Sequence, residues 1–347
     1  MSVLTEYANF RDPIGLLRRM IASRDPAARA ALVRAAGTVA MTPVDLALLP
    51  FERRRIRAAK PSPHPILFIV GPPRSGTTLA YQVLAHFLPV TYFNNLTDLF
   101  PRSPLSASLL FNRWLRPNPD PFHSFYGNTA GLAEPNDAFH IWNRWLGTNR
   151  YEVPETIGAD ARADMRRFFD AWRTTFDAPL LNKNNRNTAC VGLLGDIFPE
   201  AYFVEIRRDP VYVAQSLIVA RERVQGSRFV RWGLGSSNSD PARGPQGYLD
   251  DVCRQVFGID MALQAEKRRL GLHRFVEISY ERMCADPAAA IQQVHTRIWR
   301  SRLDDDTLRF DLRPLPAHNE ITIDGHEFEQ IQSRMSDLYG HAGALGA

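Results

Sequence analysis

The sequence has little cysteine and no cysteine pair at a metal-binding spacing. Cys190, Cys253 and Cys284 are odd in number and widely separated. Disulfide frameworks use an even set of cysteines, and zinc sites or redox pairs use Cys-x-x-Cys spacing. We therefore predict reduced, mostly buried thiols in a cytoplasmic protein.

Long apolar runs are lacking as well. No run approaches the ~20 residues that a transmembrane helix needs. The N-terminal stretch carries the charged residues Glu6, Arg11 and Asp12, so we predict no signal peptide. What is present is typical of a soluble globular protein with a sizeable core, because 45% of the 347 residues are hydrophobic and 23% are charged.

Acidic residues are outnumbered by basic ones. With 42 Lys and Arg against 37 Asp and Glu, the net charge is +5 and the isoelectric point is about 9.3. Such an excess suits an anionic small ligand, nucleic acid or an anionic membrane surface. We see neither an RNA-binding aromatic pattern nor zinc-finger spacing, so we predict no nucleic-acid partner.

Hydrophobic patterns divide the chain into a helical N-terminal extension, residues 1–60, and an α/β domain, residues 61–347. The basic run 51–57 of the extension fits a solvated helix face. It also fits peripheral contact with an anionic leaflet, which leaves a place at the inner face of the membrane open. The proline-rich stretch 61–65 ends the helical pattern. The apolar, β-branched run 66–70 then predicts a strand buried on both faces.

Strands and helices are predicted to alternate through the domain. Further strands are predicted at 90–93, 180–182, 202–206 and 275–279. Helices are predicted at 79–88, 161–176, 188–198, 211–223, 251–268 and 286–299. This alternation is typical of a mainly parallel sheet with helical crossovers. We expect a loop at 233–249 and a frayed end at 340–347.

The strongest local signal is the octet 71–78, Gly-Pro-Pro-Arg-Ser-Gly-Thr-Thr, between a predicted strand and a helix. Gly71 and Gly76 have the glycine spacing of a nucleotide P-loop. We expect the backbone N–H groups of residues 75–78 to face an anion at the helix N-terminus. The hydroxyls of Thr77 and Thr78 offer further hydrogen bonds.

The octet lacks the lysine of an ATP- or GTP-binding P-loop. Thr77 stands at the lysine position, which removes the cation that reaches the terminal phosphates. The positive charge lies three residues upstream, at Arg74. These residues indicate a loop that holds one phosphate beside a cationic side chain.

This octet resembles the 5′-phosphosulfate loop of sulfotransferases that use 3′-phosphoadenosine 5′-phosphosulfate (PAPS). A second resemblance is Arg207-Arg208-Asp209-Pro210 followed by Ser216. It implies that Arg208 and Ser216 clamp the 3′-phosphate. An arginine fork at a strand end and a hydroxyl two turns into the next helix are suited to a phosphate dianion.

Two further segments resemble the same family. The run 182–185, Asn-Lys-Asn-Asn, implies that Lys183 contacts the sulfonyl group, although Asn184-Asn185 replace the family's Asp-Pro pair. The run 279–281, Ser-Tyr-Glu, implies that Tyr280 lies near the adenine. The donor-binding residues implied by the resemblance are Arg74, Ser75, Gly76, Thr77, Thr78, Arg208, Ser216 and Tyr280.

The resemblance, over roughly residues 66–300, implies an α/β fold of the P-loop type. It is a three-layer sandwich around a central, mainly parallel sheet, with the donor across the C-terminal edge. It also implies transfer of a sulfonyl group from PAPS, as co-substrate, to an acceptor hydroxyl. Cations such as Arg74 and Lys183 would stabilise the transition state by analogy with phosphoryl transfer. We predict no metal.

The general base is expected between the octet and Lys183, where family members use His or Glu. The candidates are His123, Glu134, Asp137 and His140. We favour Glu134, because Pro135 fixes its approach. Asp137 also fits a first-turn carboxylate that complements a helix dipole, and His140 fits the polar face of a helix.

The acceptor is expected to contact the segment 101–136, which contains Trp114, Phe122, Phe125 and Tyr126. Aromatic faces stack on carbohydrate rings, and this segment looks similar to sulfotransferases of bacterial surface polysaccharides. The resemblance implies a glycan or glycolipid acceptor. A P-loop kinase or NTPase and a non-catalytic nucleotide-binding module are the alternatives.

Overall fold

The computed structural model describes residues 13–116, 118, 122–235, 247–303 and 312–345. A five-stranded parallel sheet forms its centre, with the order β2-β5-β1-β6-β7. The strands are β1 (Ile66–Val70), β2 (Thr91–Tyr92), β5 (Leu180–Lys183), β6 (Tyr202–Arg207) and β7 (Phe275–Ser279). All five strands coincide with predicted ones, so the predicted α/β fold with a central parallel sheet is confirmed.

The N-terminal half of the chain contributes seven of the described helices and a hairpin. These elements are α1 (Pro13–Ala22), α2 (Pro26–Ala58), α3 (Thr77–Phe87), α4 (Leu96–Leu99), α5 (Pro104–Phe111), α6 (Phe139–Leu146), α7 (Ala159–Phe176) and the antiparallel pair β3 (Ser124–Phe125) and β4 (Asn128–Thr129). The short 3₁₀ turn η2 (Asn112–Trp114) follows α5. The sequence pattern did not predict the hairpin.

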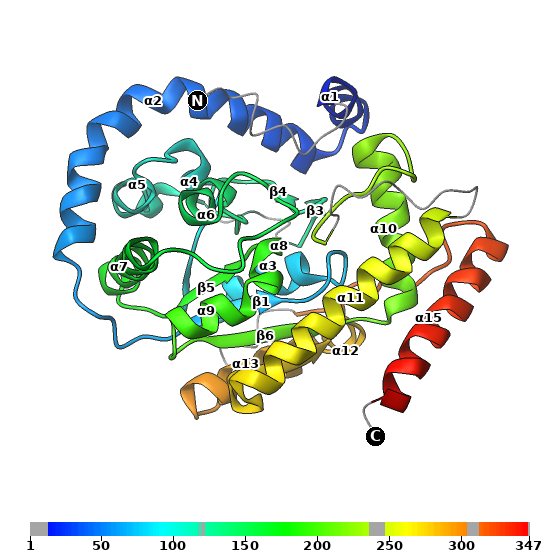
Figure 1. Ribbon diagram of the computed structural model, residues 1–347. Helices are drawn as coiled ribbons and strands as arrows, with labels where there is room; N and C mark the ends of the chain where they lie inside the picture. Colours follow the sequence, from blue (N-terminus) through cyan, green and yellow to red (C-terminus); the bar gives the residue numbers. More distant parts are fainter. Residues whose placement is uncertain (1–12, 117, 119–121, 236–246, 304–311, 346–347) are drawn as a thin grey trace.

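The C-terminal half is mainly helical. Its elements are α8 (Asn185–Ala189), α9 (Val191–Ile197), α10 (Pro210–Gln225), α11 (Gly247–Leu270), η3 (Leu272–Arg274), α12 (Tyr280–Ala285), α13 (Pro287–Trp299) and α15 (Gly325–Leu345). The prediction of a frayed end at 340–347 is wrong for 340–345, because α15 continues to Leu345, and 346–347 lie outside the described residues. This helix lies beside α11 in Figure 1, and Tyr339 and Arg334 bond to acidic residues of α11. The predicted loop 233–249 lies largely outside the described residues.

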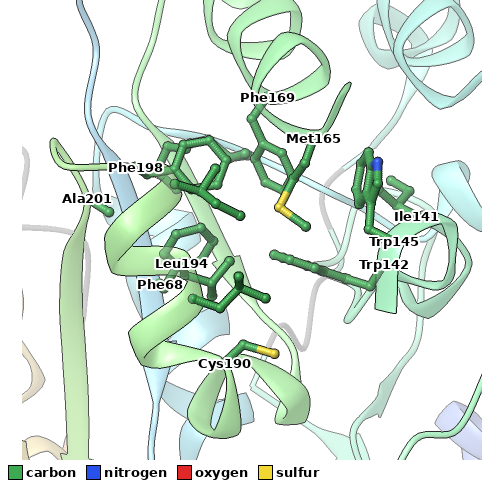
Figure 2. Packing of buried hydrophobic residues seen from close by; sticks show 14 of the residues in the cluster. Phe68, Ile141, Trp142, Trp145, Met165, Phe169, Cys190, Leu194, Phe198 and Ala201 are labelled. Carbon is green, nitrogen blue, oxygen red and sulfur yellow. The ribbon is translucent and has the colours of Figure 1, made fainter. Parts of the chain in front are cut away.

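Strand β1 is buried along its whole length, and its alternate side chains enter two separate cores. Phe68 faces α6, α7 and α9, where it packs against Trp142, Phe169 and Phe198 (Figure 2). Leu67 and Ile69 face the opposite layer, which contains α3 and α13. Strand β1 therefore lies in the sheet that forms the middle layer of a three-layer sandwich. Cys190, Cys253 and Cys284 are buried and unpaired, as predicted.

Helix α2 runs as a curved helix along the outside of the molecule (Figure 1). Asp25 caps it by accepting from the N–H groups of Ala27 and Ala28, and Pro43 and Pro50 lie inside it. Among the described residues, α2 is the one helix that is long and apolar enough to cross a membrane, with a mean hydropathy of 1.4 over its best window. The prediction that no such segment exists is therefore corrected.

Candidate functional site

The loop between β1 and α3 has the shape of an anion cradle. Gly76 is the N-cap of α3 with φ of 96°, in the left-handed region that favours glycine. A Cβ atom at Gly76 would overlap the ring of Tyr280. Gly71 is also confined, because a Cβ there would lie 2.7 Å from the carbonyl oxygen of Ile206. The hydroxyl of Thr188 bonds to both backbone groups of Gly71 at 3.0 Å and fixes the start of the loop.

Thr77 and Thr78 lie in the first turn of α3, which begins two residues earlier than the sequence pattern predicted. The first N–H groups of a helix have no intrahelical acceptor, and no side chain caps α3. These groups can bind an anion. The expectation for the N–H of Ser75 is wrong, because it donates to the carbonyl of Pro72 at 3.1 Å. The buried Ser75 hydroxyl has no partner among the described residues, so Ser75 contributes an orphaned hydroxyl instead.

The structure brings Arg74, Arg208 and Ser216 together. Nε of Arg74 donates to Oγ of Ser216 at 3.1 Å, and Nη1 of Arg208 donates to the carbonyl of Arg74 at 2.9 Å. Among the described residues, Arg74 has no ion pair with a carboxylate. Burial lowers the pKa of Arg74 from its ordinary value, and the charge of Arg208 lowers it further. A cluster of cations without a carboxylate partner is suited to bind an anion.

Tyr280 lies behind the loop rather than in an open cleft. Its ring is buried against Gly76 and under the Arg208 guanidinium, 4.6 Å from the ring centre. Its hydroxyl accepts from the N–H of His318 at 3.1 Å. Tyr280 therefore fixes Arg208 and the loop in place, and its expected contact with adenine stays a prediction.

Lys183, at the end of β5, forms an ion pair with Asp137. Both side chains are largely buried, and Nζ lies 2.9 Å from Oδ2 and 3.1 Å from Oδ1. Burial raises the pKa of Asp137, although Lys183 and Arg150 act in the opposite direction. The pair lies next to the loop, because a Cβ atom at Gly127 would be 4.0 Å from both Nζ of Lys183 and Oγ1 of Thr78.

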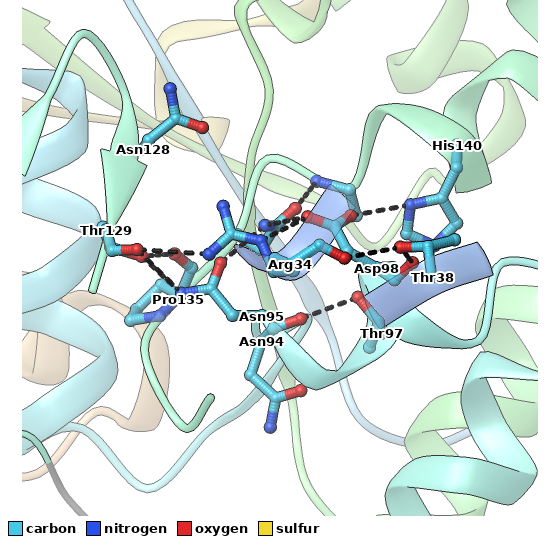
Figure 3. A network of polar contacts seen from close by, with 12 residues as sticks. Arg34, Thr38, Asn94, Asn95, Thr97, Asp98, Asn128, Thr129, Pro135 and His140 are labelled. Carbon is cyan, nitrogen blue, oxygen red and sulfur yellow. Dashed lines mark hydrogen bonds and ion pairs between the residues drawn. The ribbon is translucent and has the colours of Figure 1, made fainter. Parts of the chain in front are cut away.

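A hydrogen-bond network holds the segment that carries Asp137 (Figure 3). Asp98 of α4 accepts from Nε of Arg34 at 3.1 Å and from Nδ2 of Asn136 at 2.6 Å. Its other oxygen lies 2.9 Å from Nδ1 of His140. Burial acts to raise the pKa of Asp98, but His140 and Arg34 hold it below its ordinary value. On the other side, Nδ2 of Asn184 donates to the carbonyl of Asp137 at 2.8 Å. Asp137 is therefore positioned by residues from α2, α4 and the end of β5.

The other candidate bases lie in different surroundings. Glu134 is buried, in a turn where its N–H donates to the carbonyl of Gly131 and its carbonyl accepts from Asn95. His123 is half-exposed and pairs with Asp25 at 3.0 Å. His140 is held by Asp98, and its Nε2 is buried without a hydrogen-bond partner among the described residues. Of the four candidates, Asp137 is the one that forms an ion pair with Lys183 within the described part of the chain.

The hairpin β3–β4 carries its turn to Arg74 and Lys183, and the sequence pattern missed this placement. Its turn contains Tyr126 and Gly127, both with positive φ. The ring of Tyr126 lies 4.9 Å from the Arg74 guanidinium and 6.2 Å, edge-on, from Trp232. The predicted aromatic cleft is divided, because Phe122 packs near His86 and Trp114 packs against Phe111. Tyr126 is the aromatic residue of this set that reaches Arg74.

A sequence model of the sulfotransferase family matches residues 65–298. The chain belongs to the sulfotransferase family. Enzymes of this family take a sulfonyl group from PAPS, so the chain is a PAPS-dependent sulfotransferase. The matched region begins at β1 and ends in α13, and it contains the octet, Lys183, Arg208 and Ser216.

Two solved sulfotransferases share the fold. Sulfotransferase STF1 from Mycobacterium tuberculosis H37Rv is 12% identical with a TM-score of 0.54, and the match covers 97% of this chain and 99% of that chain. Sulfotransferase STF9 from Mycobacterium avium is 16% identical with a TM-score of 0.53, covering 82% and 78%. No curated protein sequence matches the chain.

The residues around the octet fit the donor of this family. The cradle needs glycine at two positions, Ser75 keeps an orphaned hydroxyl, and Arg74 has no carboxylate partner among the described residues. Within the same residues, no group of three His, Cys, Asp or Glu side chains is arranged to hold a metal ion. Metal-free transfer stays a prediction.

Proposed function

We propose that this sulfotransferase joins the sulfonyl group of PAPS to a hydroxyl of a glycan or glycolipid, with Lys183 and Asp137 at the reaction centre. The observation that carries this assignment is the buried ion pair between these two side chains, with Gly127 close to both Lys183 and Thr78 of the octet. It is the place where a cation can meet the moving sulfonyl group while a carboxylate meets the incoming hydroxyl.

The donor binds at the carboxyl ends of β1 and β6, beside the Lys183–Asp137 ion pair. The N–H groups and hydroxyls of Thr77 and Thr78, with Gly76 and Ser75, receive the 5′-phosphate, and Arg74 neutralises its charge. Arg208 and Ser216 receive the 3′-phosphate. Arg208 bonds to the backbone carbonyls of Arg74 and His318, and Ser216 accepts a hydrogen bond from Arg74. We expect the phosphates to replace part of these contacts.

Asp137 is the group best placed to take the hydroxyl proton. The acceptor oxygen forms a bond to sulfur as the bond from sulfur to the 5′-phosphate oxygen breaks, and the hydroxyl proton passes to the Asp137 carboxylate. Lys183 turns from Asp137 to the sulfonyl oxygens and stabilises the charge that develops there. The raised pKa of Asp137 makes it a stronger base than an exposed aspartate.

Sequence reasoning favoured Glu134 as the base, and His140 is a further candidate. Three isosteric variants separate them: Asp137→Asn, Glu134→Gln and His140→Gln. We expect Asp137→Asn to lower kcat by about 10²–10⁴, the range of general-base catalysis, while affinity for the product nucleotide is kept. If Glu134→Gln or His140→Gln shows that loss instead, the assignment of Asp137 is wrong.

A glycan or glycolipid acceptor is supported by the aromatic groups near Arg74. Tyr126 lies over the Arg74 guanidinium, and Trp232 lies edge-to-face with Tyr126. Labelled PAPS incubated with an oligosaccharide panel, a glycolipid panel and simple phenols tests this class. Transfer to phenols alone would remove the glycan proposal and leave the donor assignment standing.

A further inference from the structure

Helix α2 packs apolar residues such as Met41 and Leu48 on the domain, but it departs from an ordinary surface helix in two respects. A surface helix normally buries its apolar stripe and exposes its charges. Three charged residues of α2, namely Arg34, Asp45 and Glu52, are buried. Exposed instead are large apolar side chains, namely Val33, Val39, Val44, Leu46 and Phe51.

Each buried charge of α2 is bonded to the domain. Arg34 binds Asp98, Asp45 accepts from the N–H of Ser103 at 2.9 Å, and Glu52 accepts from the N–H of Ser106 at 2.7 Å. These residues are 11 and 7 positions apart, close to whole numbers of helical turns, and so they share one face. A helix that crossed a bilayer would have to give up these bonds. Helix α2 therefore lies flat on the domain.

The outward face is uncharged over a long stretch. Between residues 35 and 51 the only charged residue is Asp45, which is fully buried. Val39 is 76% exposed and Phe51 is 61% exposed. Helix α1 continues this surface with the exposed side chains of Ile14, Leu17 and Ile21. We call the exposed apolar residues of α1 and α2 the apolar face.

Exposed arginines border the apolar face. They are Arg18, Arg24, Arg29, Arg53, Arg54, Arg55 and Arg57. A groove of about 630 Å³ joins the two kinds of side chain, because apolar residues at 46, 49 and 50 line it together with arginines at 53, 54 and 57. The described part of α1 and α2, residues 13–58, contains no exposed acidic residue: Asp45 and Glu52 are buried, and Asp25 caps α2 and pairs with His123.

We propose that the apolar face docks on an anionic lipid surface. Apolar side chains enter the boundary between headgroups and acyl chains, and the bordering arginines meet lipid phosphates, as in interfacial helices. A second copy of the chain fits less well. Two such faces packed together would bring arginine clusters to one contact with no exposed carboxylate between them.

Vesicle flotation of the full chain tests this docking. The probes are vesicles of neutral phosphatidylcholine and vesicles with about 30% phosphatidylserine, at low and at physiological salt. We expect binding to anionic vesicles that weakens with salt, and much weaker binding to neutral ones. Equal binding to both kinds of vesicle, or none to either, would overturn the proposal.

Matched variants separate the two contributions. Arg53→Gln with Arg54→Gln should lower anionic-vesicle affinity about 10- to 30-fold, since each basic residue contributes near the leaflet. Val39→Ser with Phe51→Ser should lower it at least about 10-fold at every salt concentration. The controls are Leu272→Ser, and Arg254→Gln with Arg268→Gln, which change exposed residues of η3 and α11.

The controls should bind vesicles like the wild type, and all variants should keep the wild-type melting temperature, because the changed side chains are exposed. Sedimentation of the same proteins tests the alternative, in which a second copy of the chain covers the apolar face. If the wild type is a dimer that Val39→Ser with Phe51→Ser converts to a monomer, and neither binds vesicles, then the face binds a second copy and the lipid proposal fails.

Discussion

The residues proposed to bind the donor, here called the donor side, lie where β1 and β6 pass into α3 and α10. The residues proposed to meet the acceptor, here called the acceptor side, lie between residues 94 and 140. On the donor side, Arg74 and Arg208 lie in the strand-to-helix connections that the sequence motifs mark, while their side chains bond to Ser216, His318 and Asn319. On the acceptor side, Asn136, next to Asp137, bonds to Asp98, which in turn bonds to Arg34 of α2. Local motifs therefore indicate where the donor side lies along the chain, whereas the place of Asp137 depends on contacts between distant segments.

The largest effect is expected where the two sides meet. Lys183→Met should lower kcat by about 10²–10³, as loss of one transition-state stabiliser does. It should also lower the free energy of unfolding by about 3–5 kcal/mol, because Asp137 is left as a buried charge without its partner. Steady-state kinetics and urea unfolding measure the two effects.

The double variant Lys183→Met with Asp137→Asn sharpens this result. Removing the second charge should restore much of the stability and none of the rate. If kcat recovers together with stability, the pair is only a structural ion pair and the proposed reaction centre is wrong.

The next effect concerns the donor side alone. Gly76→Ala introduces a Cβ into the ring of Tyr280 at a backbone position with positive φ, so the cradle must distort. We expect the affinity for 3′-phosphoadenosine 5′-phosphate to fall by about 100-fold, equivalent to about 2.7 kcal/mol. Calorimetric titration checks this.

A matched glycine controls for the backbone change. Gly258 lies inside α11, and a Cβ there meets nothing within 4 Å. Gly258→Ala should leave nucleotide affinity unchanged and raise the free energy of unfolding by about 0.5–1 kcal/mol. Equal affinities for the two alanine variants would show that the octet does not hold the nucleotide.

A smaller effect is expected from the acceptor side alone. Arg34→Ala leaves Asp98 without its arginine, so the segment that carries Asp137 should loosen. We expect kcat to fall by about 10-fold while affinity for the product nucleotide stays within about twofold. A change in nucleotide affinity as large as the change in kcat would contradict the separation of the two sides.

The smallest effect is a shift in pH dependence. The pKa of Asp137 is raised by burial, so kcat/KM should fall on the acid side at a pH above the ordinary range of aspartate. Asp137→Asn should remove this acid-side fall in kcat/KM. An acid limb that persists unchanged in Asp137→Asn must come from another group.

The two carboxylates also have opposite effects on stability. The folded pKa of Asp137 is raised, so its contribution to stability is regained as the pH falls through that pKa. The folded pKa of Asp98 is lowered, so its stabilisation is present above the unfolded pKa and is lost as the pH falls through the folded one. Replacing Asp98 by Asn should therefore flatten the acid loss of stability in urea titrations.

Much of the donor side could be predicted from the sequence. The run 66–70 is apolar throughout, which indicates a strand buried on both faces, and the octet has glycines at P-loop spacing. The strand and helix ends then place Arg74, Arg208 and Ser216 at one edge of the sheet. Two details of the donor side were not predicted. The N–H of Ser75 bonds within a turn, and Tyr280 packs beneath the loop.

The acceptor side could not be predicted in the same way. Asp137 and Glu134 are three residues apart in an irregular stretch, so no periodicity says which one faces Lys183. That choice is made by Asn136, His140 and Asn184, which bond to groups far away in the sequence. The sequence also did not predict that α2 buries charged residues and exposes apolar ones, because a helical apolar pattern does not say which face packs on the domain.

The central claim is that the octet and Arg208 bind a 3′-phosphorylated adenine nucleotide. Calorimetric titration with 3′-phosphoadenosine 5′-phosphate, 5′-AMP and ATP tests it most directly, on the wild type, Arg208→Ala and the adjacent control Arg207→Ala. We predict tight binding of the 3′-phosphorylated nucleotide alone, lost in Arg208→Ala and kept in Arg207→Ala, whose side chain is exposed and pairs with Glu277. Preference for ATP, or equal binding with and without the 3′-phosphate, would contradict the account.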